Sequence, residues 1–162
     1  MLINWKLREI ILKIVYYGTG LCGKTTNLKH IHEGSPEGGA SKLLSLATQT
    51  DRTLFFDLLP IELGTLAGMK IRLQLYTVPG QVFYNSTRQM VLKGADGVVF
   101  VVDSQRPLLA ANEESLQNLK DNLRELGTSF DEIPFVVQYN KLDLPNVAPT
   151  AELEAHLNAR GA

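Results

Sequence analysis

The chain has 162 residues, of which 44% are hydrophobic and 20% charged, and its formal net charge is −1. This length suits one domain spanning residues 1–162, and the near-zero charge gives no electrostatic basis for a broad nucleic-acid or membrane surface. The single cysteine, Cys22, excludes a disulfide within the chain and fits a reducing cytosol. No apolar run has the length of a membrane span, and neither a leader peptide nor a lipid-anchor motif is predicted.

The N-terminal residues 2–9 are predicted to form an extra strand that leads into the first core strand, with Trp5 packed at its edge. A β-branched and aromatic run at 10–17 is that core strand. A helix is expected from Lys24 to Ile31, followed by a glycine-rich loop. The short apolar run 43–47 is left open between strand and helix.

Further along the chain, strands and helices continue to alternate. Residues 69–76 alternate apolar and polar side chains and are predicted to pair antiparallel with the strand before them, through a turn near 64–68. The remaining strands are expected at 54–59, 97–103 and 133–139, and the remaining helices at 108–126 and 149–159. This alternation predicts an α/β fold with a mostly parallel sheet.

Between the first core strand and the first helix, residues 18–25 read GTGLCGKT and fit the phosphate-binding pattern G-x-x-x-x-G-K-[ST] at every fixed position. The glycines allow close backbone approach, the loop N–H groups form an anion nest, and the helix N-terminus adds positive potential. Lys24 supplies a charge for the outer phosphates and Thr25 a hydroxyl for Mg²⁺. The alternative is a ligand-free glycine turn. The residues expected to contact nucleotide here are Gly18, Thr19, Gly20, Leu21, Cys22, Gly23, Lys24, Thr25 and Thr26.

A second motif, Asn140-Lys141-Leu142-Asp143, follows the strand predicted at 133–139. The Asp143 carboxylate can accept from the two N–H donors of a guanine edge, whereas adenine would leave it unpaired. The Asn140 amide can tie this loop to the phosphate loop, and the Lys141 stem can cover the base. The alternative is a polar turn after a strand. In the context of a phosphate loop, the motif predicts guanine-nucleotide binding.

With these motifs in place, the chain resembles the Ras-like small GTPases and, among them, the bacterial MglA family. The resemblance also rests on residues 15–18, on the segment 51–57 (DRTLFFD) and on the segment 76–84 (YTVPGQVFY), and it covers residues 8–145. It implies a Ras-like three-layer P-loop fold with one antiparallel strand, bound GTP or GDP, and Mg²⁺. It further implies a switch controlling bacterial polarity and motility, a roadblock-type activating partner similar to MglB and acting as a dimer, polarity effectors, and a cytoplasmic protein recruited to a cell pole.

The same resemblance implies the catalytic residues, which are Gln81, Arg52 and Lys24. Gln81, directly after Gly80, resembles the glutamine that orients the attacking water, and Arg52 resembles an arginine finger supplied in cis. Thr53, with Thr25, resembles a ligand of Mg²⁺. The alternatives are a turn residue for Gln81, a solvated loop arginine for Arg52 and a strand-start residue for Thr53.

The sequence departs from the Ras-like pattern in two places. Thr77 stands where most small GTPases have an aspartate that holds Mg²⁺ through water, and Asp57 is a candidate replacement because it shares strand parity with Thr53. An exposed strand carboxylate is an equal alternative for Asp57. The second departure is the C-terminus, where the last strand and helix of a Ras-like domain are not found. Either the sequence is a truncated or partly ordered product, or this last layer is lost. Its absence would leave the strand 133–139 at an open edge and the base pocket without one wall.

A phosphate loop is compatible with three functions: a GTP-hydrolysing switch, a nucleotide-dependent interaction scaffold with little turnover, and a small-molecule P-loop kinase. Arg52 and Gln81 favour the first, Thr77 and the short C-terminus the second, and the motif at 140–143 disfavours the third. Cys22 lies at a helix N-terminus beside Lys24, so a favoured thiolate that nucleotide protects from alkylation is also expected.

Overall fold

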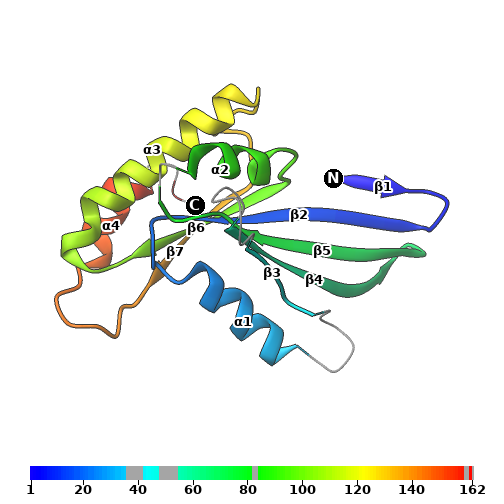
Figure 1. The fold of residues 1–162 in the computed structure, drawn as a ribbon, viewed down its shortest axis with the longest axis horizontal. Coiled ribbons are helices and arrows are strands. Elements are labelled where there is room, and N and C mark those ends of the chain that lie inside the picture. The colour runs from blue at the N-terminus through cyan, green and yellow to red at the C-terminus, as the bar shows by residue number, and fades with distance from the viewer. Residues whose placement is uncertain (36–41, 48–54, 82–83, 159–160, 162) are drawn as a thin grey trace.

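The computed structural model describes residues 1–35, 42–47, 55–81, 84–158 and 161. In these residues, helices cover both faces of a central sheet: α1 lies on one face, and α2 and α3 lie on the other, so that the molecule has three layers (Figure 1). The strands are β1 (Leu2–Asn4), β2 (Glu9–Tyr17), β3 (Leu44–Ala47), β4 (Phe55–Leu66), β5 (Met69–Thr77), β6 (Gly97–Asp103) and β7 (Phe135–Asn140). The helices are α1 (Lys24–Gly34), α2 (Asn85–Leu92), the short 3₁₀ helix η2 (Arg106–Leu108), α3 (Leu109–Glu125) and α4 (Thr150–Leu157).

The sheet has the order β3-β4-β5-β2-β6-β7, with β1 paired to the start of β2. The pairs β5-β2, β2-β6 and β6-β7 are parallel, as the alternation of strands and helices predicts. The pair β4-β5 is antiparallel, which confirms that prediction, and its turn is at 67–68. Because β1 also runs antiparallel to β2, two strands oppose the main direction of the sheet rather than the single strand expected.

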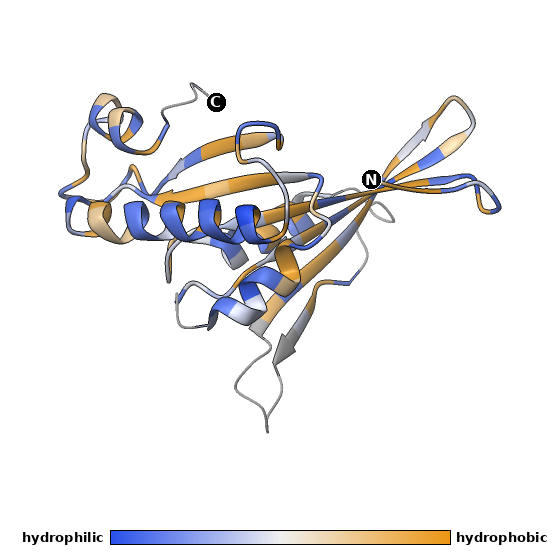
Figure 2. Cartoon of the chain, turned by 90° about the horizontal axis from the view of Figure 1, so that it is seen from above, coloured by the Kyte–Doolittle hydropathy of each residue, from blue (hydrophilic) through white to orange (hydrophobic). Residues whose placement is uncertain are grey.

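Alternation along the buried strands divides the core into two clusters. Val15 and Tyr17 of β2, together with Phe100 of β6, pack toward the side of α2 and α3. Tyr16 and Val101 belong to the second cluster, which contains Leu28 of α1. Figure 2 shows the hydrophobic colours concentrated on the strands, with a hydrophilic outer face on α3. The parallel strands are therefore covered on both faces and end together at the phosphate-loop side of the sheet.

Three elements differ from the sequence predictions. Residues 2–9 are not one strand, because β1 ends at Asn4 and a turn at 5–8 leads into β2. The prediction for Trp5 is wrong, since its side chain lies in that turn and is 76% exposed. Helix α2 was not predicted, because its eight residues include only Met90, Val91 and Leu92 as apolar side chains and give little periodic signal.

The short apolar run whose type the sequence left open is strand β3, the partner of β4. Helices α1, α3 and α4 and strand β7 begin or end within a few residues of the predicted positions. Within the described residues, β7 is the last strand of the sheet on its side, and no helix in that part of the chain is long and apolar enough to span a membrane.

Candidate functional site

The phosphate loop connects the end of β2 to the start of α1, and two of its glycines are required by the geometry. Gly18 has φ 144°, and a Cβ there would lie 2.3 Å from the Val101 carbonyl oxygen. Gly23 has φ 106°, and its Cβ would lie 2.3 Å from the Asn140 side-chain nitrogen. A Cβ on Gly20 would meet nothing within 4 Å, but a Cβ on Gly80 would lie 2.3 Å from the Gly20 Cα. The loop is therefore packed against the sheet and against the segment that carries Gly80.

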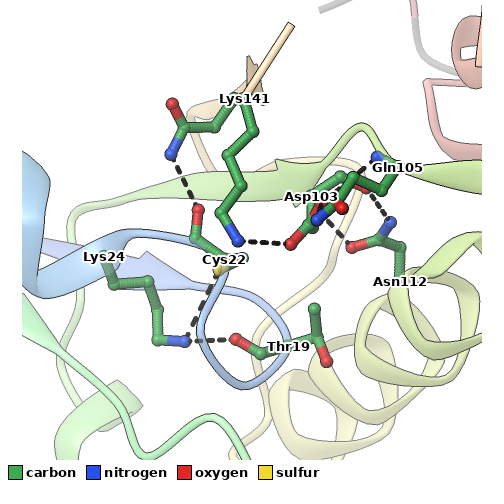
Figure 3. Close-up of polar contacts among 8 residues, drawn as sticks. Thr19, Cys22, Lys24, Asp103, Gln105, Asn112 and Lys141 are labelled. Carbon is green, nitrogen blue, oxygen red and sulfur yellow. Dashed lines mark hydrogen bonds and ion pairs between the residues drawn. The ribbon is translucent and has the colours of Figure 1, made fainter. Parts of the chain in front are cut away.

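Lys24 is buried, and among the described residues its ammonium group binds only atoms of the loop itself. Its Nζ donates to the Thr19 carbonyl oxygen at 2.6 Å and lies 3.6 Å from the Cys22 Sγ (Figure 3). It also donates to the Gly18 carbonyl oxygen at 3.0 Å. Burial lowers the pKa of Lys24, and the nearby positive charge of Arg88 lowers it further. An ammonium held by neutral oxygens in a desolvated loop is suited to exchange them for phosphate oxygens.

The prediction of a favoured Cys22 thiolate is wrong. The side chain is fully buried, and burial raises the pKa of the thiol more than Lys24 lowers it. The helix N-terminus and the lysine were correctly recognised, but the sequence did not show that Cys22 packs in the core between β2 and α1. A buried thiol of this kind fills space rather than reacts.

The Asp57 carboxylate of β4 accepts hydrogen bonds from hydroxyl groups on three neighbouring elements. Its Oδ2 accepts from Thr25 Oγ1 at 2.6 Å and from Thr77 Oγ1 at 2.9 Å, and its Oδ1 accepts from Ser45 Oγ at 2.6 Å. The Asp57 carboxylate therefore lies beside the hydroxyl of the phosphate-loop threonine and does not stand alone on the strand. Ser45 was not recognised in the sequence, because its segment gave no clear secondary-structure signal.

A set of hard oxygen ligands of this kind fits Mg²⁺, which prefers one or two carboxylates, hydroxyls and phosphate oxygens over a cage of protein side chains. In the described ranges, no group of three or more His, Cys, Asp or Glu side chains converges as a metal site. The cluster of Thr25 and Asp57 lines a pocket of about 400 Å³ together with Lys24 and Gly80. The oxygen groups and the ammonium group thus face one cavity.

The guanine-type loop after β7 is joined to the phosphate loop as the sequence predicts. Asn140 Nδ2 donates to the Cys22 carbonyl oxygen at 2.8 Å. Lys141 has a left-handed backbone with φ 64°, and its Nζ pairs with Asp103 Oδ2 at 2.7 Å (Figure 3). Burial alone raises the pKa of Asp103, but hydrogen bonds from Lys141 and Gln105 outweigh it and lower that pKa, so the pair stays ionised. Asp143 is exposed at the same loop.

The residues of the segment that follows β5 differ in how deeply they are buried. Val78 is buried, Gly80 lies against the phosphate loop, and Gln81 is exposed. Gln81 lines a second cavity between α3 and the phosphate-loop residues Thr19 and Gly20, and it does not line the 400 Å³ pocket beside Lys24. Arg52 and Thr53 were also singled out from the sequence, and they lie outside the described residues.

Two other predicted contact residues have distinctive positions. Leu21 has a left-handed backbone with φ 61° and a side chain that is 92% exposed, while Thr26 is exposed at the start of α1. Both line the 400 Å³ pocket with Gly23 and Lys24. A phosphate loop between strand and helix, joined to an Asn-Lys-x-Asp loop at the carboxyl ends of parallel strands, defines a P-loop protein that binds guanine nucleotides.

Comparisons with known proteins agree with this class. A family model described as the ADP-ribosylation factor family matches residues 1–161. The chain belongs to this family of Ras-like small GTPases, which are guanine-nucleotide-binding GTP hydrolases, and the resemblance found from the motifs is confirmed. The chain is 57% identical over 158 residues to the Mutual gliding-motility protein MglA of Myxococcus xanthus (strain DK1622), covering 98% of this chain and 81% of that protein.

A weaker match supports only the nucleotide-binding part of the argument. The chain is 32% identical over 118 residues to the thymidylate kinase of Pseudomonas fluorescens (strain Pf0-1), covering 66% of this chain and 55% of that protein. The guanine-type loop at 140–143, tied to the phosphate loop, is the feature that favours the GTPase over a small-molecule kinase.

Proposed function

We propose that this protein is a GTP/GDP switch that hydrolyses GTP and controls cell polarity and motility in a bacterium. The observation that carries the switch is the 2.8 Å hydrogen bond from Asn140 to the Cys22 carbonyl, because it couples the base-recognition loop to the phosphate loop. The link to motility is supported by the 57% identity to a gliding-motility protein. Control of cell polarity is the more specific part of this proposal.

Mg²⁺ is proposed to be held by Thr25 and Thr53, with Asp57 supplying the carboxylate that Thr77 cannot. The hydroxyl of Thr25 and the carboxylate of Asp57 are 2.6 Å apart, so both can reach one ion or its water ligands. A bound Mg²⁺ would neutralise charge on the β- and γ-phosphate oxygens. Thr77 keeps a supporting role, because its hydroxyl accepts from the Asp57 N–H at 2.9 Å and donates to the Asp57 carboxylate.

Cleavage of GTP is proposed to use Gln81 to orient water and Arg52 to bind the charge that develops on the γ-phosphate. Gln81 is exposed and lines the cavity between the phosphate loop and α3, so its side chain is not fixed beside Lys24. Residues 48–53 are rich in Thr, Gln and Asp with few apolar anchors, which gives little sequence support for a preorganised Arg52. The basal rate is therefore expected to be low.

A partner that places Gln81 and Arg52 together would then control turnover. We propose a roadblock-type activating protein similar to MglB, acting as a dimer, with polarity effectors as further partners. The proposed location is the cytoplasm with recruitment to a cell pole. The support for these proposals is the family resemblance of the segments 51–57 and 76–84 and the position of Gln81 outside the phosphate pocket.

The second candidate function is a nucleotide-dependent scaffold with little turnover, and the exposed Gln81 favours it. Single-turnover cleavage of GTP and ATP, each with and without the activating partner, separates the candidates. The switch predicts GTP cleavage that the partner accelerates and no comparable ATP cleavage. Tight GTP binding without cleavage under either condition would favour the scaffold function. Preferred cleavage of ATP would favour the small-molecule kinase.

A further inference from the structure

Arg88 of α2 is the largest fully buried side chain in the described residues, with no exposed surface. Its guanidinium binds two consecutive carbonyl groups directly before Gln81. Nε donates to the Pro79 oxygen at 2.9 Å, and Nη2 donates to the Gly80 oxygen at 2.6 Å. A planar guanidinium with donors in a fixed fork is suited to hold two such oxygens at once.

Within the described part of the chain, no acid neutralises the charge of Arg88. Across residues 1–35, 42–47, 55–81 and 84–158, no carboxylate forms an ion pair with it. The remaining donor, Nη1, binds Asn118 Oδ1 at 2.7 Å and approaches the Tyr17 hydroxyl at 3.5 Å, and the guanidinium lies 4.9 Å from the Tyr17 ring centre. Burying a cation among neutral groups is costly, so an apolar residue would serve stability better here.

The partners of Arg88 connect it to the phosphate loop. Tyr17 is the last residue of β2, immediately before Gly18. Its hydroxyl donates to Asn118 Oδ1 at 2.6 Å and accepts from Asn122 Nδ2 at 2.9 Å. Asn118 and Asn122 also donate to Asn85 Oδ1 at the start of α2. Arg88 is thus fixed by a buried polar cluster that joins β2, α2 and α3.

The two carbonyl contacts also fix the peptide groups before Gln81. A trans peptide is planar, with its C=O and N–H on opposite sides. Because the Pro79 oxygen points to Arg88, the Gly80 N–H points away from it, and the same holds for the Gly80 oxygen and the Gln81 N–H. On its other side, Gly80 is in tight contact with Gly20 of the phosphate loop. Arg88 therefore holds the segment against the loop that binds phosphate.

The charge of Arg88 also reaches that loop. Burial lowers the pKa of Lys24, and the charge of Arg88 lowers it in the same direction. A group that repels a proton on Lys24 attracts an anion at the same place. Arg88 thus has two separable properties toward the phosphate site, which are its charge and its grip on two carbonyls.

We infer that Arg88 is a positioning residue for GTP cleavage, which orients the Gly80 and Gln81 peptides while its charge favours the anionic nucleotide. The inference rests on GTP hydrolysis at the proposed site. Lysine at this position keeps the charge but has no planar fork, so it cannot hold both carbonyls in the same geometry. The two properties are therefore separated by comparing Arg88→Lys with Arg88→Met.

The test is single-turnover GTP cleavage and GDP affinity, measured on folded protein whose nucleotide-binding stoichiometry is known. Both Arg88→Lys and Arg88→Met should cleave GTP about 10- to 100-fold more slowly, as expected for a misplaced reacting group. Arg88→Lys should keep GDP affinity within about twofold of the wild type, whereas Arg88→Met should weaken it further. Gln89→Ala is the matched control, since it removes α2–α3 hydrogen bonds with Asn122 and Glu125 without touching Pro79 or Gly80.

If Arg88→Lys cleaves GTP at the wild-type rate, the positioning role is overturned and the proposed function stands. If Gln89→Ala slows cleavage as much as Arg88→Lys, loosened α2–α3 packing explains the effect, and the role is again overturned. A wild-type protein that binds but never cleaves GTP would instead overturn the proposed function, and this inference with it.

Discussion

The two sides of the nucleotide pocket are built differently. On the base side, the end of β6 and residues 140–148 are joined by backbone hydrogen bonds such as Ser104 N to Asn140 O at 3.1 Å and Ala148 N to Ser104 O at 2.8 Å. The Asn140 bond to Cys22 and the Lys141–Asp103 ion pair add side-chain links. On the γ-phosphate side, Gln81 is exposed, and Arg88 binds the two carbonyl groups directly before it.

This difference assigns binding and turnover to separate parts of the molecule. A densely hydrogen-bonded base side needs little reorganisation to accept a nucleotide, so affinity should depend on it. In the proposed mechanism Gln81 acts at the γ-phosphate, so the rate should depend on how its segment is placed. Substitutions on the two sides should therefore change different measured quantities.

The largest effect is expected at Arg52. An arginine placed at the γ-phosphate is worth about 10³- to 10⁵-fold in rate, so Arg52→Ala should lose that much of the partner-stimulated cleavage. Gln81→Leu should lose stimulation as well, and both variants should keep GTP and partner binding. Partner-stimulated turnover is the measurement. A near-wild-type stimulated rate for Arg52→Ala would mean that the arginine comes from elsewhere.

The next largest effect is expected at Lys24. Lys24→Ala removes a buried counter-charge from the phosphates, which should cost about 3–5 kcal/mol of nucleotide binding free energy. Calorimetry with GDP measures the loss, and Thr26→Ala at the exposed start of α1 is the control with the smaller change. Unchanged GDP affinity in Lys24→Ala would contradict the assignment of residues 18–25 as the phosphate-binding loop.

On the base side, Asp143→Asn should weaken guanine recognition selectively. The loss of a charged acceptor for two N–H donors costs about 2–3 kcal/mol. When GTP and ATP are each used to displace one labelled nucleotide, the variant should lose affinity for GTP relative to ATP. The cleavage rate of bound GTP should stay the same. Competition curves that do not move relative to each other would contradict the role of Asp143.

A smaller effect is expected for Asp57→Asn, which keeps the shape of the side chain but removes its charge. The Mg²⁺ concentration needed for half-maximal GTP cleavage should rise about 10-fold, in the range seen when groups that support a metal site are changed. Ser45→Ala removes one hydroxyl from the same carboxylate and is the matched control. An unaltered Mg²⁺ dependence in Asp57→Asn would assign the carboxylate a purely structural role.

The smallest effect is expected at Cys22. Because burial raises the pKa of its thiol, the group stays protonated at neutral pH, and alkylation should be slow both with and without GDP. Labelling rates followed by mass spectrometry test this expectation. Fast labelling that GDP suppresses would restore the reactive thiolate first expected from the sequence.

Local sequence patterns and linear motifs predicted most of the fold and most of the residues of the two binding loops. The strand at 97–103 and the helix at 109–125 have strong periodic or continuous apolar patterns, and linear motifs identify the residues from Gly18 to Thr25 and from Asn140 to Asp143. The Asn140 contact with the phosphate loop was also expected, because parallel strands end at one edge of the sheet.

What the sequence did not reveal depends on contacts between distant segments. Arg88 is polar and lies in a short helix, so a pattern-based analysis places it on the surface, although three neutral oxygens from other segments hold it in the core. Trp5 was expected to pack because it is large and apolar, but no element among the described residues buries it. The burial of Cys22 likewise results from tertiary packing that no local pattern encodes.

The arrangement of Asp57 and Thr77 also has an evolutionary consequence. These residues lie side by side on antiparallel strands, next to the paired residues Leu58 and Tyr76, and they exchange two hydrogen bonds. Converting this arrangement to one with the carboxylate at position 77 requires two substitutions. Changing position 57 first leaves no carboxylate, and changing position 77 first places two carboxylates in contact, which repel each other. In the proposed Mg²⁺ site, each order is therefore expected to pass through a form that binds the ion less well.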